Sequence, residues 1–200
     1  DLAKLISFDM DFEQMPVGYR PSVFRLSGAE GEAGFAVTDQ AARDGQKSYR
    51  CVDRKGLKKP FYPYIHLAPR KLNEGTVSFA FDAMQAAENP AAFYVEFRGR
   101  GSTRDVGPSL RVNRDGKLTA GGTPFLETRP GDWFHVEITF KLGADAAKEY
   151  SLLTRCRGEQ TRRTLPFEHE TFSDLRWLGI TPFEDADGVF YLDNMKLQVE

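Results

Sequence analysis

Apolar and polar residues alternate with a period of two along most of the chain. This alternation is typical of strands that bury one face, because successive side chains of a strand point to opposite sides. No segment keeps the pattern of an amphipathic helix for more than about two turns. The predicted strands are Leu5–Glu13, Phe35–Thr38, Gln46–Val52, Phe61–Leu67, Gly75–Asp82, Phe93–Gly99, Ser109–Asn113, Trp133–Lys141, Tyr150–Arg157, Arg176–Thr181 and Val189–Val199.

Short strands at this spacing predict an all-β fold: a two-sheet antiparallel β-sandwich, or jelly roll. The helix-like segments Ala83–Glu88 and Ala144–Lys148 are too short for stable helices and are interpreted as loop decorations. No repeat or linker interrupts the pattern, so residues 1–200 are predicted to form a single sandwich domain. Surface connections are predicted at Gly99–Gly107, Asn113–Pro124 and Arg157–Thr164.

Four of the predicted strands have one apolar face and one face with an unusual set of side chains. An ordinary solvated face is rich in Lys, Glu, Thr and Ser, whereas these faces carry rings and planar hydrogen-bonding groups. Aromatic rings stack on the apolar side of a sugar, and Arg, Glu and His bind its hydroxyls or carboxylates. The candidate ligand-binding residues are Tyr62, Tyr64, His66, Tyr94, Glu96, Arg98, Arg111, Trp133 and His135.

This interpretation requires the four strands to lie side by side in one sheet. The alternative is that some of these side chains are partly buried packing residues at strand ends or under a loop. The apolar faces opposite them, which are predicted to be buried, consist of Phe61, Pro63, Ile65 and Leu67; Phe93, Val95 and Phe97; Leu110 and Val112; and Phe134, Val136, Ile138 and Phe140.

Three short motifs resemble one family of carbohydrate-binding modules. They are FDMDFE at residues 8–13, DGQKSY at residues 44–49 and FYLDN at residues 190–194. Together they resemble the calcium-bearing, galactose-binding-like jelly-roll modules, in which the two chain ends pair and hold a structural Ca²⁺. The resemblance implies ligands from the carboxylates of Glu13 and Asp193 and from backbone carbonyls near Asp11, Asp44 and Lys47, an oxygen shell of the kind calcium prefers.

A fourth motif points to a different superfamily with the same architecture. The strand GDWFHVEITF at residues 131–140 resembles the concanavalin A-like, laminin-G-type jelly roll. Both resemblances imply a two-sheet sandwich. The alternative for Asp9, Asp11 and Glu13 is a half-exposed strand without metal. Its opposite, buried face would consist of Phe8, Met10 and Phe12.

Two enzymatic interpretations stay open. A polysaccharide lyase needs a group that neutralises a uronate carboxylate, a base for the C5 proton and an acid for the leaving oxygen. The residues that could supply this set are His66, Tyr64, Tyr94, Arg98 and Arg111. The run Asp9-x-Asp11-x-Glu13 also resembles the carboxylate strand of laminarinase-like glycoside hydrolases, although Asp replaces the expected first Glu.

Composition excludes several other classes. With 27 Lys and Arg against 29 Asp and Glu the net charge is −2, so general attraction to nucleic acid is not expected. No apolar run is long enough to span a membrane. The 3 histidines lack metal-site spacing, and 2 cysteines, Cys51 and Cys156, leave both free thiols and one disulfide possible.

The sequence therefore favours a carbohydrate-binding domain without chemistry of its own, binding a polysaccharide or oligosaccharide on the decorated face. Such a domain is expected to be extracellular or periplasmic, with a possible catalytic domain or enzyme as partner. The alternatives are a polysaccharide lyase that uses the same face and a protein-interaction sandwich.

Overall fold

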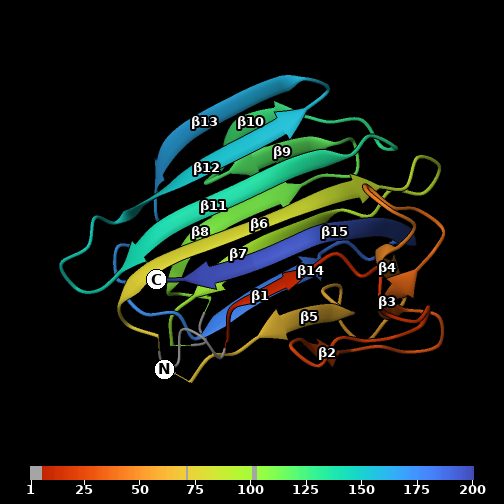
Figure 1. Cartoon of the computed structure of the whole chain (residues 1–200), viewed down its shortest axis with the longest axis horizontal. Coiled ribbons are helices and arrows are strands. Elements are labelled where there is room, and N and C mark those ends of the chain that lie inside the picture. The colour runs from red at the N-terminus through yellow and green to blue at the C-terminus, as the bar shows by residue number, and fades with distance from the viewer. Residues whose placement is uncertain (1–5, 71, 101–102) are drawn as a thin grey trace.

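Two antiparallel sheets pack face to face in the computed structural model of the protein, which describes residues 6–70, 72–100 and 103–200 (Figure 1). The predicted fold class, an all-β sandwich of the jelly-roll type, is confirmed. Among the described residues, no helix is long and apolar enough to cross a membrane.

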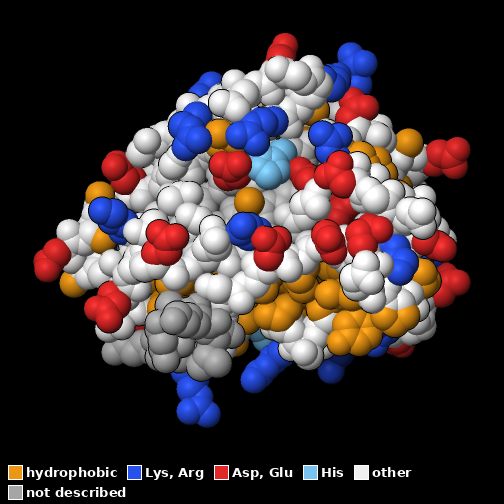
Figure 2. Space-filling view, viewed as in Figure 1, with side chains coloured by type: hydrophobic (Ala, Val, Ile, Leu, Met, Phe, Trp, Pro, Cys, Tyr) orange, Lys and Arg blue, Asp and Glu red, His pale blue; other side chains and the backbone are white. Residues whose placement is uncertain are grey.

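The eight-stranded sheet has the order β13-β12-β11-β6-β15-β4-β3, and β1 also pairs with β15. Its outer face is turned toward the viewer in Figures 1 and 2 and carries scattered charges of both signs. In chain order its strands are β1 (Phe8–Met10), β3 (Gly34–Thr38), β4 (Ser48–Asp53), β6 (Gly75–Gln85), β11 (Phe134–Leu142), β12 (Glu149–Cys156), β13 (Glu159–Pro166) and β15 (Gly188–Val199).

The seven-stranded sheet has the order β10-β9-β8-β7-β14-β5-β2 and lies behind the first. Within this sheet the adjacent strands β7, β14 and β5 bring together segments that are far apart in the sequence. In chain order its strands are β2 (Arg25–Ser27), β5 (Tyr64–Leu67), β7 (Phe93–Arg98), β8 (Val106–Val112), β9 (Lys117–Ala120), β10 (Thr123–Glu127) and β14 (Trp177–Pro182).

Phenylalanines fill the space between the sheets. Phe93 of β7 stacks on Phe190 of β15 with ring centroids 4.3 Å apart, and Phe97 meets Phe79 of β6 edge to face. Such pairs add specific geometry to the burial of a large apolar area. The sheets are thereby fixed face to face, and the outward side chains of each sheet are held on a rigid layer.

Each predicted strand has a counterpart in the structure, with shifted ends. Leu5, the predicted start of the first strand, lies outside the described residues. The prediction of loops at Asn113–Pro124 and Arg157–Thr164 was wrong: these segments contain β9, the start of β10 and most of β13. They are rich in charged and turn residues because β10 and β13 are edge strands, where charged side chains discourage pairing with other chains.

Three further predictions need correction. Residues 83–85 of the predicted loop decoration extend β6, and the short strand β2 was not predicted. Phe61 was expected in the core but is 40% exposed, because residues 61–63 precede β5 and leave the alternation of the strand. Cys51 and Cys156 are free and buried, on the separate strands β4 and β12.

Candidate functional site

A row of polar and aromatic side chains crosses the outer face of the seven-stranded sheet. In register, Gly179 of β14 lies between His66 of β5 and Glu96 of β7. The neighbouring position on β14, Thr181, pairs with Tyr94, which in turn pairs with Arg111 of β8. Residues from β5, β7, β8 and β14 thus meet on one surface.

Gly179 determines where the ring of Trp177 lies. A Cβ atom at position 179 would overlap the six-membered ring of Trp177, so the indole occupies the space that a side chain would take. From the neighbouring strand β7 the Arg98 guanidinium lies 4.1 Å from the centroid of this ring, and from β5 the His66 ring is nearly parallel to it at 6.1 Å. Trp177 is therefore held between a cation and an imidazole.

A hollow of about 280 Å³ opens beside Trp177. Its lining consists of Phe61, Tyr64, Tyr94, Arg98, Thr103, Trp177 and Thr181. The hydroxyl of Thr181 is buried and has no hydrogen-bond partner among the described residues. Because an unpaired buried hydroxyl is unfavourable, this group is available to a ligand in the hollow.

The two arginines of this surface differ in their partners. The Arg98 Nε donates to the buried carboxylate of Glu96 at 2.8 Å, and its Nη2 lies 3.3 Å from the Tyr94 hydroxyl. Arg111 is exposed and lies over the rings of Tyr94 and Phe183, at 5.8 and 5.3 Å. No ion pair holds Arg111 within the described part of the chain, so its charge is free to meet an anion.

His66 is set up to stay neutral near pH 7. Burial lowers the pKa of the imidazole below its usual 6.5, and the positive charge of Arg25 on β2 lowers it further. Its Nδ1 is buried without a partner in the described structure, and its ring lies 5.4 Å from that of Tyr64. A neutral imidazole and a tyrosine on one surface can exchange protons with a bound molecule.

A second hollow, of about 530 Å³, is lined by residues of β8 and β9 in the same sheet. Arg111 lines it together with Ser109 and Thr119, and the Tyr94–Arg111 pair joins the two hollows. We call the combined surface the aromatic groove, defined by Tyr64, His66, Tyr94, Arg98, Arg111, Trp177 and Thr181. Its length across several strands suits a chain-like ligand better than a small molecule.

Most of the predicted ligand-binding residues lie on this face. Tyr64, His66, Tyr94, Arg98 and Arg111 belong to the aromatic groove. Glu96 lies in its floor and is buried by its pairing with Arg98. Tyr62 stands beside it, with its ring covering Gly28 and stacked 6.0 Å from Tyr64.

Trp133 and His135 do not lie with the others, so the prediction that all nine share one face was wrong. Trp133 directly precedes β11 and His135 is part of it, and β11 belongs to the eight-stranded sheet. The outward side chains of β11 therefore lie on the opposite side of the sandwich from the aromatic groove. Alternation reveals which residues share a face of one strand, but not which sheet the strand joins.

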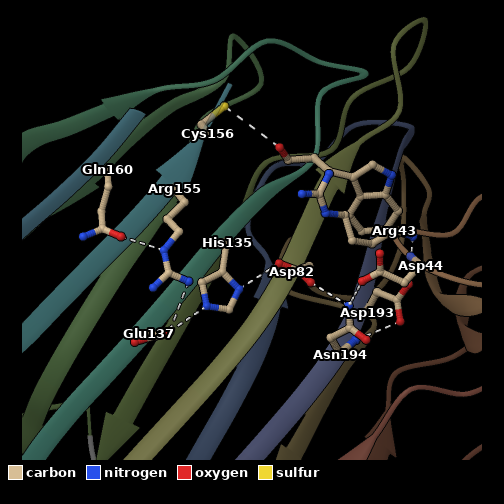
Figure 3. Close-up of polar contacts among 11 residues, drawn as sticks. Arg43, Asp44, Asp82, His135, Glu137, Arg155, Cys156, Gln160, Asp193 and Asn194 are labelled. Carbon is tan, nitrogen blue, oxygen red and sulfur yellow. Dashed lines mark hydrogen bonds and ion pairs between the residues drawn. The ribbon is translucent and has the colours of Figure 1, made fainter. Parts of the chain in front are cut away.

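His135 instead belongs to a polar network on β6, β11 and β15 (Figure 3). Its ring nitrogens lie 2.8 Å from Asp82 and 3.0 Å from Glu137, and hydrogen bonding to Asp82 in particular raises the pKa of the imidazole. Asn194, at a bulge of β15 with φ 47°, donates to Asp82 and Asp44. The network is internally paired and fixes this bulge.

The residues of the predicted calcium site lie where the chain ends meet, but donors of the chain itself take their oxygens. The Glu13 carboxylate accepts backbone N–H bonds from Gln46 and Lys47, and the Lys47 ammonium donates to the carbonyls of Glu13 and Met15 at 3.0 and 2.8 Å. Asp193 accepts backbone N–H bonds from the 43–44 segment.

Asp11 bonds to the backbone N–H of Glu13, and the Asp44 carboxylate accepts the Asn194 amide. In the described residues no three His, Cys, Asp or Glu side chains gather as a metal site. The donor set therefore does not fit a calcium ion well, because backbone N–H groups already bond to the Glu13 and Asp193 carboxylates and the Lys47 ammonium lies beside Glu13. Calcium binding stays a prediction of the resemblance, which a melting experiment tests.

Sequence reasoning missed Trp177 and Thr181. Both lie within the predicted strand Arg176–Thr181, where the alternation Trp177, Gly179, Thr181 would have indicated a decorated face. Phe61 and Phe183 carry no such signal, because each lies just outside a strand and its direction depends on the turn.

No protein-family model matches this sequence, and no curated protein matches it either. Solved structures with the same fold do match. An alginate lyase mutant in complex with an alginate tetrasaccharide aligns with TM-score 0.61 at 11% identity, over 96% of each chain. The endo-β-1,4-glucuronan lyase of the fungus Trichoderma reesei gives TM-score 0.59 at 8% identity, over 96% of this chain and 95% of that chain.

An alginate lyase of polysaccharide lyase family 7 gives TM-score 0.55 at 13% identity, over 86% of this chain and 84% of that one. At such identities the similarity shows the fold alone. The fold is thus the jelly-roll sandwich that these lyases have. The comparisons support this architecture but neither the galactose-binding-like nor the concanavalin A-like assignment in particular.

Proposed function

We propose that the protein is a polysaccharide lyase that cleaves a uronate-containing glycan bound in the aromatic groove. One observation carries the proposal: neutral His66, the Tyr64 hydroxyl and the unpaired Arg111 share the same sheet face as an aromatic hollow. The similarity to alginate and glucuronan lyases supports it, because their fold is the fold of this chain.

The chemistry is a β-elimination with defined roles. Arg98, which contacts the same Trp177 ring as His66, binds the carboxylate of the uronate that is cleaved and stabilises the charge that develops when the neighbouring C5 loses its proton. His66 accepts that proton, the electron pair forms a C4–C5 double bond, and the C4–O4 bond breaks. Tyr64 donates its hydroxyl proton to the departing O4, which becomes the new chain end. Arg111, three strands from His66, binds the carboxylate of another uronate of the chain, and Trp177 positions the sugar.

The non-catalytic carbohydrate-binding domain remains the second candidate. The specific observation in its favour is the Arg98–Glu96 ion pair, which uses part of the positive charge of the groove inside the protein. Binding would then depend on the rings and on Arg111, and no bond of the glycan would break.

Incubation with alginate, a polyglucuronate and a neutral glucan separates the two candidates. The proposal predicts that a uronate polymer is shortened and gains ultraviolet absorbance from the unsaturated ends, while the neutral glucan is unchanged. His66→Gln and Tyr64→Phe should each lower the rate by about a hundredfold or more. Trp133→Ala, on the other sheet, is the matched control and should leave the rate unchanged. Co-elution with uronate chains of unchanged length would support the binding domain and refute the lyase.

A further inference from the structure

A separate hollow of about 260 Å³ lies at the far edge of the eight-stranded sheet. Its floor is the outer face of β3, where Gly34 and Ala36 are too small to fill the space. The segment 17–20 forms one wall and is fixed by backbone bonds between Gly18 or Tyr19 and Val37. In Figures 1 and 2, hydrophobic side chains gather around the corner that holds β1 to β5.

Two arginines line this hollow. Arg50 of β4 pairs with Ala36 in register, and its Nε is buried without a hydrogen-bond partner among the described residues. Arg20 comes from the wall, and its Nη2 lies 3.8 Å from the position of a Cβ on Gly34. We call this site the arginine hollow, defined by Arg20, Gly34, Ala36 and Arg50.

Among the described residues, no nearby carboxylate forms an ion pair with these arginines. Glu32 lies near Arg50 but is bonded to Arg54 at 2.6 Å. Asp39 lines the rim and is exposed to water, and no ion pair joins it to Arg20 or Arg50 in the part of the chain that the structure describes. A half-buried guanidinium with an unpaired Nε favours an incoming oxyanion, because planar N–H groups and carboxylate oxygens match in geometry.

Apolar surface adjoins the two charges. Val17, in the wall of the hollow, is 56% exposed, and Tyr19, in the same segment, is 44% exposed. An exposed apolar side chain such as Val17 beside a cation suits a sugar that carries a carboxylate, because the C–H surface of the sugar can pack on it, whereas a free inorganic anion would gain nothing from it.

We propose that the arginine hollow is a second binding site, for the carboxylate of an acidic saccharide, on the sheet opposite the aromatic groove. The choice of a saccharide rests on the proposed function, whereas the choice of an oxyanion rests on Arg20 and Arg50 alone. A chain bound here would keep the protein on its polymer while the groove engages another segment, which raises the effective concentration of the glycan.

Titration calorimetry with a purified alginate trisaccharide tests the proposal. The His66→Gln background keeps the saccharide intact if the groove is catalytic. Two equivalents should bind, and adding Arg20→Gln with Arg50→Gln should remove one of them. Each single change should weaken that site by about tenfold. The control is Arg129→Gln, which removes the same charge from an exposed position elsewhere and should leave both sites intact, and unchanged melting temperatures show that the variants fold.

Two results would overturn the proposal. Either the double variant keeps both equivalents, or inorganic phosphate displaces the trisaccharide from this site with equal affinity, which would make it a site for free anions. Failure of the groove is distinguishable, because Arg111→Gln removes the groove equivalent only. The protein could also bind one equivalent of trisaccharide only. If that equivalent is lost in the double Arg20→Gln, Arg50→Gln variant and retained in Arg111→Gln, the result supports the arginine hollow and counts against the proposed function.

Discussion

Gly179 is the residue on which the geometry of the aromatic groove depends most directly. Its lack of a side chain lets the Trp177 ring lie between Arg98 and His66. A methyl group there displaces the ring and leaves the guanidinium and the imidazole without their common partner.

Gly179→Ala should therefore impair the groove more than the fold. We expect saccharide binding to weaken by about tenfold or more, at a cost of about 1–3 kcal/mol in stability from overpacking. Tryptophan fluorescence and a binding titration measure the two effects. Unchanged binding with a displaced ring would show that Trp177 does not contact the ligand.

His66 gives a residue-scale prediction about pH. Because its pKa is lowered from 6.5, the imidazole is neutral at pH 7 and gains a proton only in more acidic solution. Cleavage should be constant near neutrality and fall as pH decreases through that lowered pKa. An acid limb that persists in His66→Gln would assign the base to another group.

At the scale of elements, the network on β6, β11 and β15 predicts how stability depends on pH. The folded-state pKa of His135 is raised above 6.5, so its stabilisation is present below 6.5 and is lost as pH rises through the folded value. Burial raises the pKa of Asp193 to about 6 and that of Asp53 to about 7, so folding binds protons at these sites too.

All three groups act in the same direction, and the melting temperature should be higher at pH 6 than at pH 8. His135→Gln should flatten this difference, whereas His169→Gln, whose Nδ1 accepts a backbone bond outside the network, serves as the comparison. A melting temperature that rises from pH 6 to pH 8 would contradict the assignment.

The strands show how far the sequence predicts the fold. Alternation identified β5, β7, β8 and β11 and their buried faces, because burial of one face is a local property of a strand. It could not show that β11 joins the other sheet, since strand pairing depends on contacts between distant segments. It also missed β13, whose polar residues are set by an exposed edge rather than by a core.

At the scale of the whole molecule, the first and last strands, β1 and β15, pair, and the described residues around them leave no evident place for a metal. The Lys47 ammonium holds the carbonyls of Glu13 and Met15 where the resemblance predicts calcium. We expect the melting temperature to be the same in EDTA and in millimolar Ca²⁺. A clear rise with Ca²⁺ would establish the predicted ion, because a ligand of the folded state stabilises it.

The two faces of the sandwich divide the candidate functions. The aromatic groove lies on the seven-stranded sheet, and the arginine hollow lies at the edge of the other. The sequence predicted the residue types of the groove but not its hollows, because their shape depends on Gly179 and on turns around Phe61 and Phe183. The arginine hollow escaped detection because its floor consists of small residues.

The most direct test of the central claim is to incubate the wild-type protein with alginate and a polyglucuronate and follow chain length by size-exclusion chromatography with ultraviolet detection. The account predicts shortened chains whose new ends absorb in the ultraviolet, and no such product with His66→Gln. Uronate chains of unchanged length, bound or unbound, would contradict it.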